Sequence, residues 1–201
     1  MTSKAARWSV IAALLAATLA GTDRVQAEPV KLGKGLFLIA EPSLRDPNFR
    51  ETVILITHHN ATGTMGVVIN RPTTTPLSHL LEDHEDLAEL ADTLHLGGPV
   101  DRGVLLLLVR SLARPDHADH VFDHVYFSQS LDVLIDALKS HDPNTAVRLF
   151  SGYAGWAPGQ LADEITRGSW RVVPADPTVV FDRDADVIWR EMIRRTSEQY
   201  I

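Results

Sequence analysis

The sequence predicts a single α/β domain with α+β character, built on a mixed β-sheet. Three observations predict this fold class. The composition, with 45% hydrophobic and 22% charged residues among 201, is that of an ordinary globular protein. Short apolar segments are interspersed with segments of helical periodicity, in an order too irregular for a strict βαβ repeat. After Gly35 no internal repeat and no Pro/Gly/Ser-rich linker divides the chain, so residues 28–201 are expected to form one domain.

The first 27 residues have the pattern of a secretory signal peptide. Lys4 and Arg7 precede the apolar run 8–20, and the segment ends in Val25-Gln26-Ala27, a small-residue cleavage site. A membrane anchor would need about 20 apolar residues, so cleavage after Ala27 is favoured and would leave no membrane span. Export predicts a periplasmic or secreted protein. A translation start further downstream, near Val30, would instead leave it in the cytoplasm.

Eight short segments are predicted to be strands because Val, Ile, Leu or Phe dominate them. They are residues 36–40, 52–57, 66–70, 104–109, 121–127, 146–150, 170–173 and 179–181. The run 104–109, Val-Leu-Leu-Leu-Leu-Val, shows no alternation of polar and apolar residues. A continuous apolar run of this length is typical of a strand that is covered on both faces.

Two segments between these strands have clear helix signals. Residues 130–140 place their apolar side chains on one face, and Ser130 or Ser128 can cap the first turn. Residues 158–167 begin with a proline, which the first turn of a helix accepts. They stop before Gly168, a favourable residue directly after a helix.

Two further segments are predicted to be helical on charge and periodicity. Residues 184–196 carry acids early and arginines late, which the helix dipole favours. The buried stripe of that helix would be Ala185, Ile188, Trp189, Met192 and Ile193. Residues 76–90 are the weaker candidate, because their five acidic residues are more naturally a solvated face.

Composition and charge exclude several classes of function. Without cysteine, the chain has no disulfide, no thiol catalysis, no thiolate zinc site and no iron–sulfur cluster. The net charge of −7 opposes sequence-independent binding to nucleic acid. Removal of residues 1–27 would take away three basic residues and one acidic residue, so −7 would become −9.

The loops that join the predicted elements carry motifs in a specific order. The motifs are Asp46-Pro47-Asn48-Phe49, TVILI at 52–56, GVVINRP at 66–72, Leu96-Gly97-Gly98-Pro99-Val100, VYFS at 125–128, FSGYAGWAPGQL at 150–161, GSW at 168–170 and PAD at 174–176. Together, between Gly35 and Trp189, they make the chain similar to the AlgH/YqgE family of bacterial proteins.

This resemblance implies a bifurcated, pseudo-barrel sheet with peripheral helices. It implies no reaction, because the family is known mainly as structures, and its name reflects a suspected regulatory role in alginate production. Members of the family usually lack an export signal. The segment before residue 28 is therefore a departure from the family pattern.

Polar and glycine-rich loop residues form a candidate ligand-binding site, although no single motif defines it. An arginine at a strand end can bind a carboxylate or phosphate bidentately, although it pairs more often with a local acid. The segment 151–160 would either present backbone N–H groups at a helix N-terminus or form a tight crossover with its tryptophan in the core, and the crossover is favoured. The predicted ligand-binding residues are Asn70, Arg71, Gly97, Gly98, Tyr153 and Trp156.

Nine histidines raise the question of a metal site. The densest set is His117, His120 and His124, which would share one face of a helix and could there bind zinc or copper. The neighbouring residues 121–127 instead suggest a strand, on which the imidazoles would stand too far apart. The sequence therefore predicts no metal site, and no motif indicates a cofactor.

Three classes of function remain, in a definite order. A non-catalytic binding or regulatory protein comes first, because the candidate residues are poor in paired acids and bases. Its partner would be a small ligand or another protein. An enzyme of unknown reaction acting on a small anionic ligand is the alternative. A transcriptional regulator comes last, because no helix-turn-helix signature or basic helix is present, and direct nucleic-acid binding is not expected.

Overall fold

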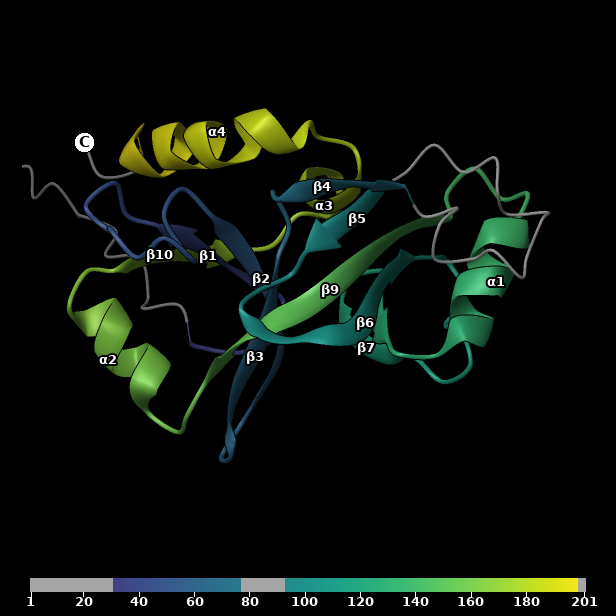
Figure 1. Ribbon diagram of the computed structural model, residues 1–201, viewed down its shortest axis with the longest axis horizontal. Coiled ribbons are helices and arrows are strands. Elements are labelled where there is room, and N and C mark those ends of the chain that lie inside the picture. The colour runs from purple at the N-terminus through teal and green to yellow at the C-terminus, as the bar shows by residue number, and fades with distance from the viewer. Residues whose placement is uncertain (1–30, 77–92, 199–201) are drawn as a thin grey trace, which may run out of the picture.

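The computed structural model describes residues 31–76 and 93–198 (Figure 1). The elements of the first half are β1 (Leu36–Ala40), β2 (Val53–Asn60), β3 (Gly63–Val68), β4 (Pro72–Pro76), β5 (Thr93–Leu96), β6 (Val100–Arg110), β7 (Asp119–Phe122) and β8 (Val125–Ser128). Those of the second half are α1 (Leu131–Lys139), β9 (Ala146–Trp156), α2 (Gln160–Thr166), β10 (Trp170–Pro174), α3 (Pro177–Phe181) and α4 (Ala185–Glu198).

The strands form one ten-stranded mixed sheet. Its main path runs β10-β1-β2-β3-β9-β6-β8-β7, and all neighbours on this path are antiparallel. β4 and β5 form a separate antiparallel pair. This pair joins the sheet through β5, which lies parallel to β9 with His95 opposite Phe150.

β9 is the strand at which the sheet divides. Along Ala146 to Ser151 it pairs with β6 on one edge, and on the other edge Phe150 and Ser151 pair with β5. Further along, Ala154 to Trp156 pair with β3 instead. β5 and β3 therefore follow one another along the same edge of β9, and the sheet opens into two branches, as the resemblance implied.

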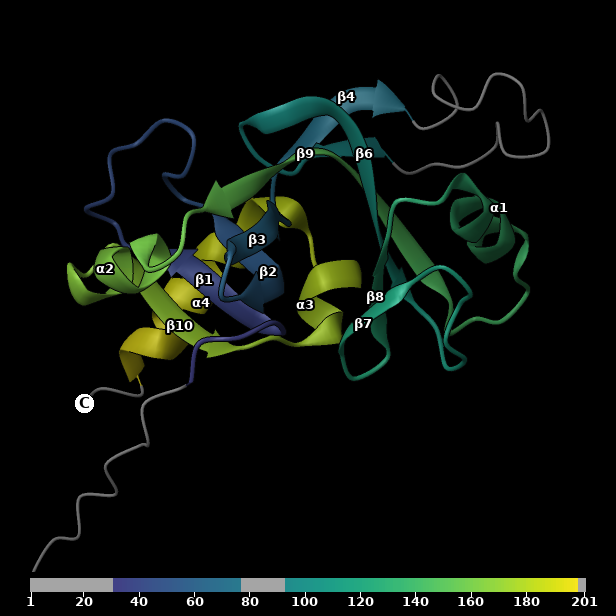
Figure 2. The ribbon, with the colours of Figure 1, turned by 90° about the horizontal axis from the view of Figure 1, so that it is seen from below.

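The sheet also curls so that its distant strands approach each other. At Gly35, just before β1, an added Cβ atom would lie 2.8 Å from the Cβ of Phe122 at the end of β7. The Lys34 ammonium donates a hydrogen bond to the His120 carbonyl (2.7 Å). Figure 2 shows α3 inside this curve, with α1 and α2 outside it at opposite ends of the molecule. The predicted single-domain, pseudo-barrel architecture with peripheral helices is confirmed.

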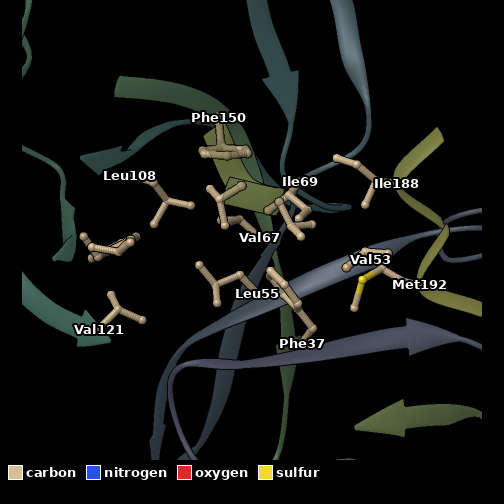
Figure 3. Packing of buried hydrophobic residues seen from close by; sticks show 14 of the residues in the cluster. Phe37, Val53, Leu55, Val67, Ile69, Leu108, Val121, Phe150, Ile188 and Met192 are labelled. Atoms are coloured by element: carbon tan, nitrogen blue, oxygen red, sulfur yellow. The ribbon is translucent and has the colours of Figure 1, made fainter. Parts of the chain in front are cut away.

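The main hydrophobic core fills the curl (Figure 3). Its fully or almost fully buried side chains come from the sheet and from the last two helices, and include Phe37, Ile39, Val53, Leu55, Val67, Ile69, Leu108, Val121, Phe150, Val180, Ile188 and Met192. Alternate residues of the same strands face outward into two smaller clusters, under α2 and under α1. Burial on both faces explains the uninterrupted apolar runs in the sequence.

Several predicted elements are confirmed with small shifts at their ends. In β6, Leu106 to Val109 are buried on both faces, with Leu107 and Val109 under α1. α4 has Ile188 and Met192 on its buried side, as expected. α1 begins after Ser130, but the Ser130 side chain makes no capping hydrogen bond, and Ser128 Oγ accepts from the Ser130 N–H instead (3.1 Å).

The segment 179–181 was predicted as a strand, and this is wrong. It lies in α3, because Asp176 caps the helix by accepting a hydrogen bond from the Thr178 N–H (2.8 Å) and a proline occupies the first turn. The predicted strand 121–127 is also wrong in extent. Asp123 has a left-handed backbone (φ 43°), so the chain turns there and forms the β7–β8 hairpin.

The predicted end of the strand 146–150 is wrong as well. β9 continues to Trp156, because Gly152 allows the backbone of Gly98 and Val100 to pass close by and residues 154–156 pair with β3. α2 accordingly begins at Gln160, two residues later than predicted, after Gly159 with φ 78°. β4 and β5 were missed, because β4 is the Pro- and Thr-rich segment PTTTP and β5 is only the four residues TLHL, so neither carries an apolar run. The predicted helix 76–90 lies outside the described residues apart from Pro76, which ends β4.

In the described part of the chain, no helix is both long and apolar enough to span a membrane.

Candidate functional site

A cleft of about 300 Å³ opens where the end of β3 meets the loop after β1 and the first turns of α4. We call it the arginine cleft, after three of the residues that line it. The lining residues are Arg50, Glu51, Asn70, Arg71, Ala185, Asp186, Trp189 and Arg190. Residues from three separate parts of the chain therefore meet at one point.

Asn70, which lies just after β3, binds the backbone at the start of β2 through its side-chain amide. Its side-chain oxygen accepts a hydrogen bond from the Val53 N–H (2.8 Å), and its side-chain nitrogen donates to the Glu51 carbonyl (2.9 Å). Both ends of the amide are thus engaged with the backbone. Asn70 positions the loop that carries Glu51 and has a structural role in the cleft.

Arg71 holds the same loop from the other side. Its guanidinium donates to the carbonyls of Asn48 (2.6 Å), Pro47 (3.2 Å) and Arg50 (3.2 Å). A guanidinium has five N–H donors, so these contacts leave two of them for a ligand. The loop is further anchored by Phe49, whose ring packs against those of both Trp156 and Trp170. One wall of the cleft is therefore built on a well-supported loop.

Arg71 carries a partly buried charge that its surroundings disfavour. Burial lowers the pKa of the Arg71 guanidinium, the nearby charge of Arg50 lowers it further, and Asp46 partly opposes both. Because arginine stays protonated in proteins at neutral pH, this lowering marks a cation held in an unfavourable environment and does not change its charge. An anion placed between Arg71 and Arg50 would relieve the repulsion.

α4 supplies the opposite wall. The Trp189 indole N–H donates to the Ala40 carbonyl (2.8 Å), which fixes this side chain against the end of β1. Arg190 donates to the Asp186 carbonyl one turn earlier (3.1 Å) and is exposed to solvent. The first turn of a helix carries partial positive charge, which adds to that of the three guanidiniums.

The six predicted site residues do not all lie together. Asn70 and Arg71 line the cleft. Gly97 and Gly98 lie where the chain crosses β9. A Cβ added to Gly97 would lie 2.2 Å from the Gly152 carbonyl oxygen, and one added to Gly98 would lie 2.1 Å from the Tyr153 carbonyl carbon. Tyr153 packs against the main core. The ligand-binding role of these residues stays a prediction.

Trp156 lies in the cluster beneath α2, away from the residues that line the cleft. It is buried, and its indole N–H donates to Glu164 Oε2 (3.0 Å), an atom that also accepts from Trp170 (2.9 Å). The interpretation that placed this tryptophan in the core is confirmed. The FSGYAGW motif is therefore part of strand β9, and its tryptophan serves the packing of that strand.

Sequence reasoning missed most of the cleft. Arg50, Glu51, Asp186, Trp189 and Arg190 come from a loop and a helix more than 130 positions apart, and no spacing in the sequence connects them. A weak signal existed in α4. The predicted buried stripe includes Trp189, and the charged residues Asp186 and Arg190 lie within one turn of it.

The histidines gather in a different place. A second cavity, of about 390 Å³, is lined by His58, His117 and Asp119 among others, with His58 Nε2 3.7 Å from Asp119 Oδ2. His120 lies on β7 and its ring contacts the Asp123 carbonyl (2.8 Å). Within residues 31–76 and 93–198, no three histidine or carboxylate side chains converge in a way that could hold a metal ion.

Comparison with known proteins identifies the fold. The family model described as AlgH-like matches residues 37–201. The chain belongs to the AlgH-like family. This AlgH-like protein is 39% identical over 164 residues to a UPF0301 protein of Streptomyces coelicolor, with 80% of this chain and 85% of the relative covered. A UPF0301 protein of Methylococcus capsulatus is 36% identical over 163 residues, with 80% and 89% covered.

Two solved structures share the architecture. The solution structure of AlgH from Pseudomonas aeruginosa superimposes with a TM-score of 0.66 at 33% identity, covering 85% of this chain and 90% of that one. The crystal structure of a protein from Corynebacterium diphtheriae gives a TM-score of 0.69 at 27% identity, covering 84% and 90%. The resemblance found in the sequence motifs is thereby confirmed.

Proposed function

We propose that this AlgH-like protein is a non-catalytic binding protein whose arginine cleft takes a small anionic ligand, a carboxylate or a phosphate. The observation that carries the proposal is the grouping of Arg50, Arg71 and Arg190 around one cleft of about 300 Å³. The net charge of the whole chain is −7, so a local excess of positive charge stands out against its surroundings.

The chemistry of the lining residues favours binding over catalysis. The cleft is lined by three arginines, two carboxylates, an amide, a tryptophan and an alanine. Guanidinium groups keep their protons, so they cannot act as general acids or bases near neutral pH. They can form two parallel hydrogen bonds to one carboxylate or phosphate, which suits recognition of an anion.

Calorimetric titration with inorganic phosphate and with short alkyl carboxylates tests the proposal. We expect saturable binding at low salt, and we expect Arg50→Ala and Arg190→Ala each to weaken it about tenfold or more, because a charge-assisted hydrogen bond contributes roughly 1.5–3 kcal/mol. Arg194→Ala is the matched control, since Arg194 is exposed on the same helix and does not line the cleft.

Two outcomes would contradict the proposal. One is the absence of binding to every anion in the series. The other is an equal loss of affinity in Arg190→Ala and Arg194→Ala, which would mean that the charge of α4 as a whole attracts the anion and the cleft does not select it.

A further inference from the structure

We propose that the ligand of the arginine cleft is a small zwitterion, with a carboxylate or phosphate at one end and an ammonium group at the other. This inference rests on the proposed function and specifies it. Its basis is the juxtaposition of Glu51 and Asp186 with three arginines in one cleft.

Arginines and carboxylates that line one small cleft would be expected to pair with each other. In the described chain, however, neither Glu51 nor Asp186 forms an ion pair with Arg50, Arg71 or Arg190. The ion pair that does form nearby joins Arg171 to Glu41 (2.6 Å). Within the described residues, the arginines and carboxylates of the cleft therefore form no ion pair with each other, and both kinds of group are available to a ligand.

The Glu51 carboxylate makes no hydrogen bond or ion pair with the residues that the structure describes, although its backbone is tightly held. The Glu51 carbonyl accepts from Asn70, and the next residue, Thr52, is buried, with its hydroxyl donating to the Phe49 carbonyl (2.7 Å). Glu51 itself has φ 55°, a left-handed conformation that a residue with a side chain adopts at a cost of about 1 kcal/mol. The backbone thus fixes the position from which the Glu51 side chain extends, while the carboxylate oxygens form no hydrogen bond in the described structure.

The same holds for Asp186 on the opposite wall. An acid in the first turn of a helix often serves as a cap, but here the Asp186 N–H is capped by the Asp184 carboxylate (3.1 Å). The Asp186 side chain is exposed and lines the cleft. Both carboxylates can therefore accept hydrogen bonds from a ligand without the loss of a structural contact.

The hydrogen-bond donors and acceptors of the cleft residues then indicate which groups the ligand must carry. Guanidinium groups only donate and carboxylates only accept hydrogen bonds, and both ends of the Asn70 amide are occupied. An anion alone would satisfy the arginines and leave two carboxylates facing it, which is unfavourable. An ammonium group donates three hydrogen bonds and accepts none, so it complements Glu51 and Asp186.

A ligand with two anionic ends is the competing possibility. A neighbouring cavity of about 440 Å³ shares Arg50 and Glu51 with the cleft and adds Arg45. A dianion could reach from one cavity to the other. We favour the zwitterion because Glu51 lines both cavities and would oppose a second negative charge in either.

The test uses three sets of nearly isosteric ligands in calorimetric titrations of the full chain at low salt. The zwitterions are glycine, β-alanine and 4-aminobutyrate. Propionate, butyrate and pentanoate replace the ammonium by a methyl group, and malonate, succinate and glutarate replace it by a carboxylate. We expect at least one zwitterion to bind about tenfold more tightly than its alkyl partner of the same length.

Variants assign the preference to the two acids. Glu51→Gln and Asp186→Asn should each reduce the preference for the zwitterion and leave binding of the alkyl carboxylate unchanged or stronger. Glu198→Gln, on the exposed far end of α4, should retain the wild-type preference. A thermal unfolding curve for each variant checks that the fold is intact.

The outcomes separate the two proposals. If each zwitterion and its alkyl partner bind equally, the zwitterion is excluded while anion binding stands. Tighter binding of a dicarboxylate would replace the zwitterion by a dianion. If no ligand of any set binds and inorganic phosphate does not bind either, both proposals fail together.

Discussion

Positions 97 and 98 require glycine because two backbone segments cross there too closely for a side chain. The Val68 N–H donates to the Gly97 carbonyl (2.8 Å), and the Gly97 N–H donates to the Ser151 carbonyl (2.9 Å), so this residue joins β3 to β9. Both glycines are among the ligand-binding residues that the sequence predicts. Nothing in a Gly-Gly-Pro motif reveals which other strand will pass within van der Waals distance, so the packing role could not be predicted.

Gly97→Ala tests that role. The added methyl group would lie 2.2 Å from the backbone oxygen of Gly152, so the strands must separate, and we expect a loss of about 1–3 kcal/mol or more in the free energy of unfolding. Urea denaturation measures it. At Gly103 an added Cβ meets no atom within 4 Å, so Gly103→Ala should change the stability little. Equal stability of the two variants would contradict the close approach.

Glu164 organises the tryptophan cluster beneath α2. Its Oε2 accepts from both Trp156 and Trp170, and its Oε1 accepts from Gln160 Nε2 (3.0 Å). In Glu164→Gln, the amide nitrogen replaces one of the two carboxylate oxygens. This nitrogen is a donor and would face another donor, either the two indole N–H groups or the Gln160 side-chain nitrogen. We expect a loss of about 1–3 kcal/mol of stability and a change in tryptophan fluorescence.

The neighbouring substitution Asp163→Asn is the control for that experiment. Asp163 is exposed, and its side chain takes no part in the hydrogen bonds around the indoles. Its replacement should leave the emission spectrum unchanged. An unaltered spectrum in Glu164→Gln as well would show that the shared carboxylate does not order the two tryptophans.

Among the helices, α4 contributes both to the core and to the arginine cleft. Ile188 is 1% exposed and lies in the main core, one position before Trp189 in the cleft wall. Ile188→Ala should lower the free energy of unfolding by about 2–5 kcal/mol. Val187→Ala, at a half-buried position beside it, should cost much less. Denaturant titration of both distinguishes a docked helix from a loosely attached one, for which the two losses would be similar.

Elements with strong local signals were predictable, and those decided by distant partners were not. The periodicity of α1 and α4 and the apolar runs of β1, β2 and β6 indicated their structure correctly. Residues 179–181 favour a strand by propensity, yet the Asp176 cap and the following proline make them helical. β4 forms from a Pro-Thr-Thr-Thr-Pro segment because β5 is available to pair with it, which no local pattern discloses.

For the whole molecule, the family and the general architecture followed from the sequence, whereas the arginine cleft did not. The motifs specify loops and crossings that define the fold. The cleft arises where the loop after β1 and the end of β3 meet the start of α4, which lies more than 100 positions further along the chain. Of its lining residues, the sequence predicts Asn70 and Arg71, because they end an apolar strand with polar groups.

Export also concerns the whole molecule, and we propose that the segment 1–27 directs it. Cleavage after Ala27 predicts that the native protein begins at Glu28 and carries the more negative charge of the shortened chain. N-terminal sequencing of protein purified from its own cell measures this directly. A protein that begins at Met1 would exclude cleavage, and one that begins near Val30 would favour a downstream translation start and a cytoplasmic location.

The position of β9 in the chain constrains how the protein is made. Both branches of the sheet depend on β9, residues 146–156, and β1 has β10 (Trp170–Pro174), near the other end of the chain, as one of its two partners. A ribosome must therefore release most of the polypeptide before the first strands can complete their hydrogen bonds. Until then the edges of β3 and β6 that β9 will cover stay unpaired, and unpaired strand edges of this kind can pair with other chains.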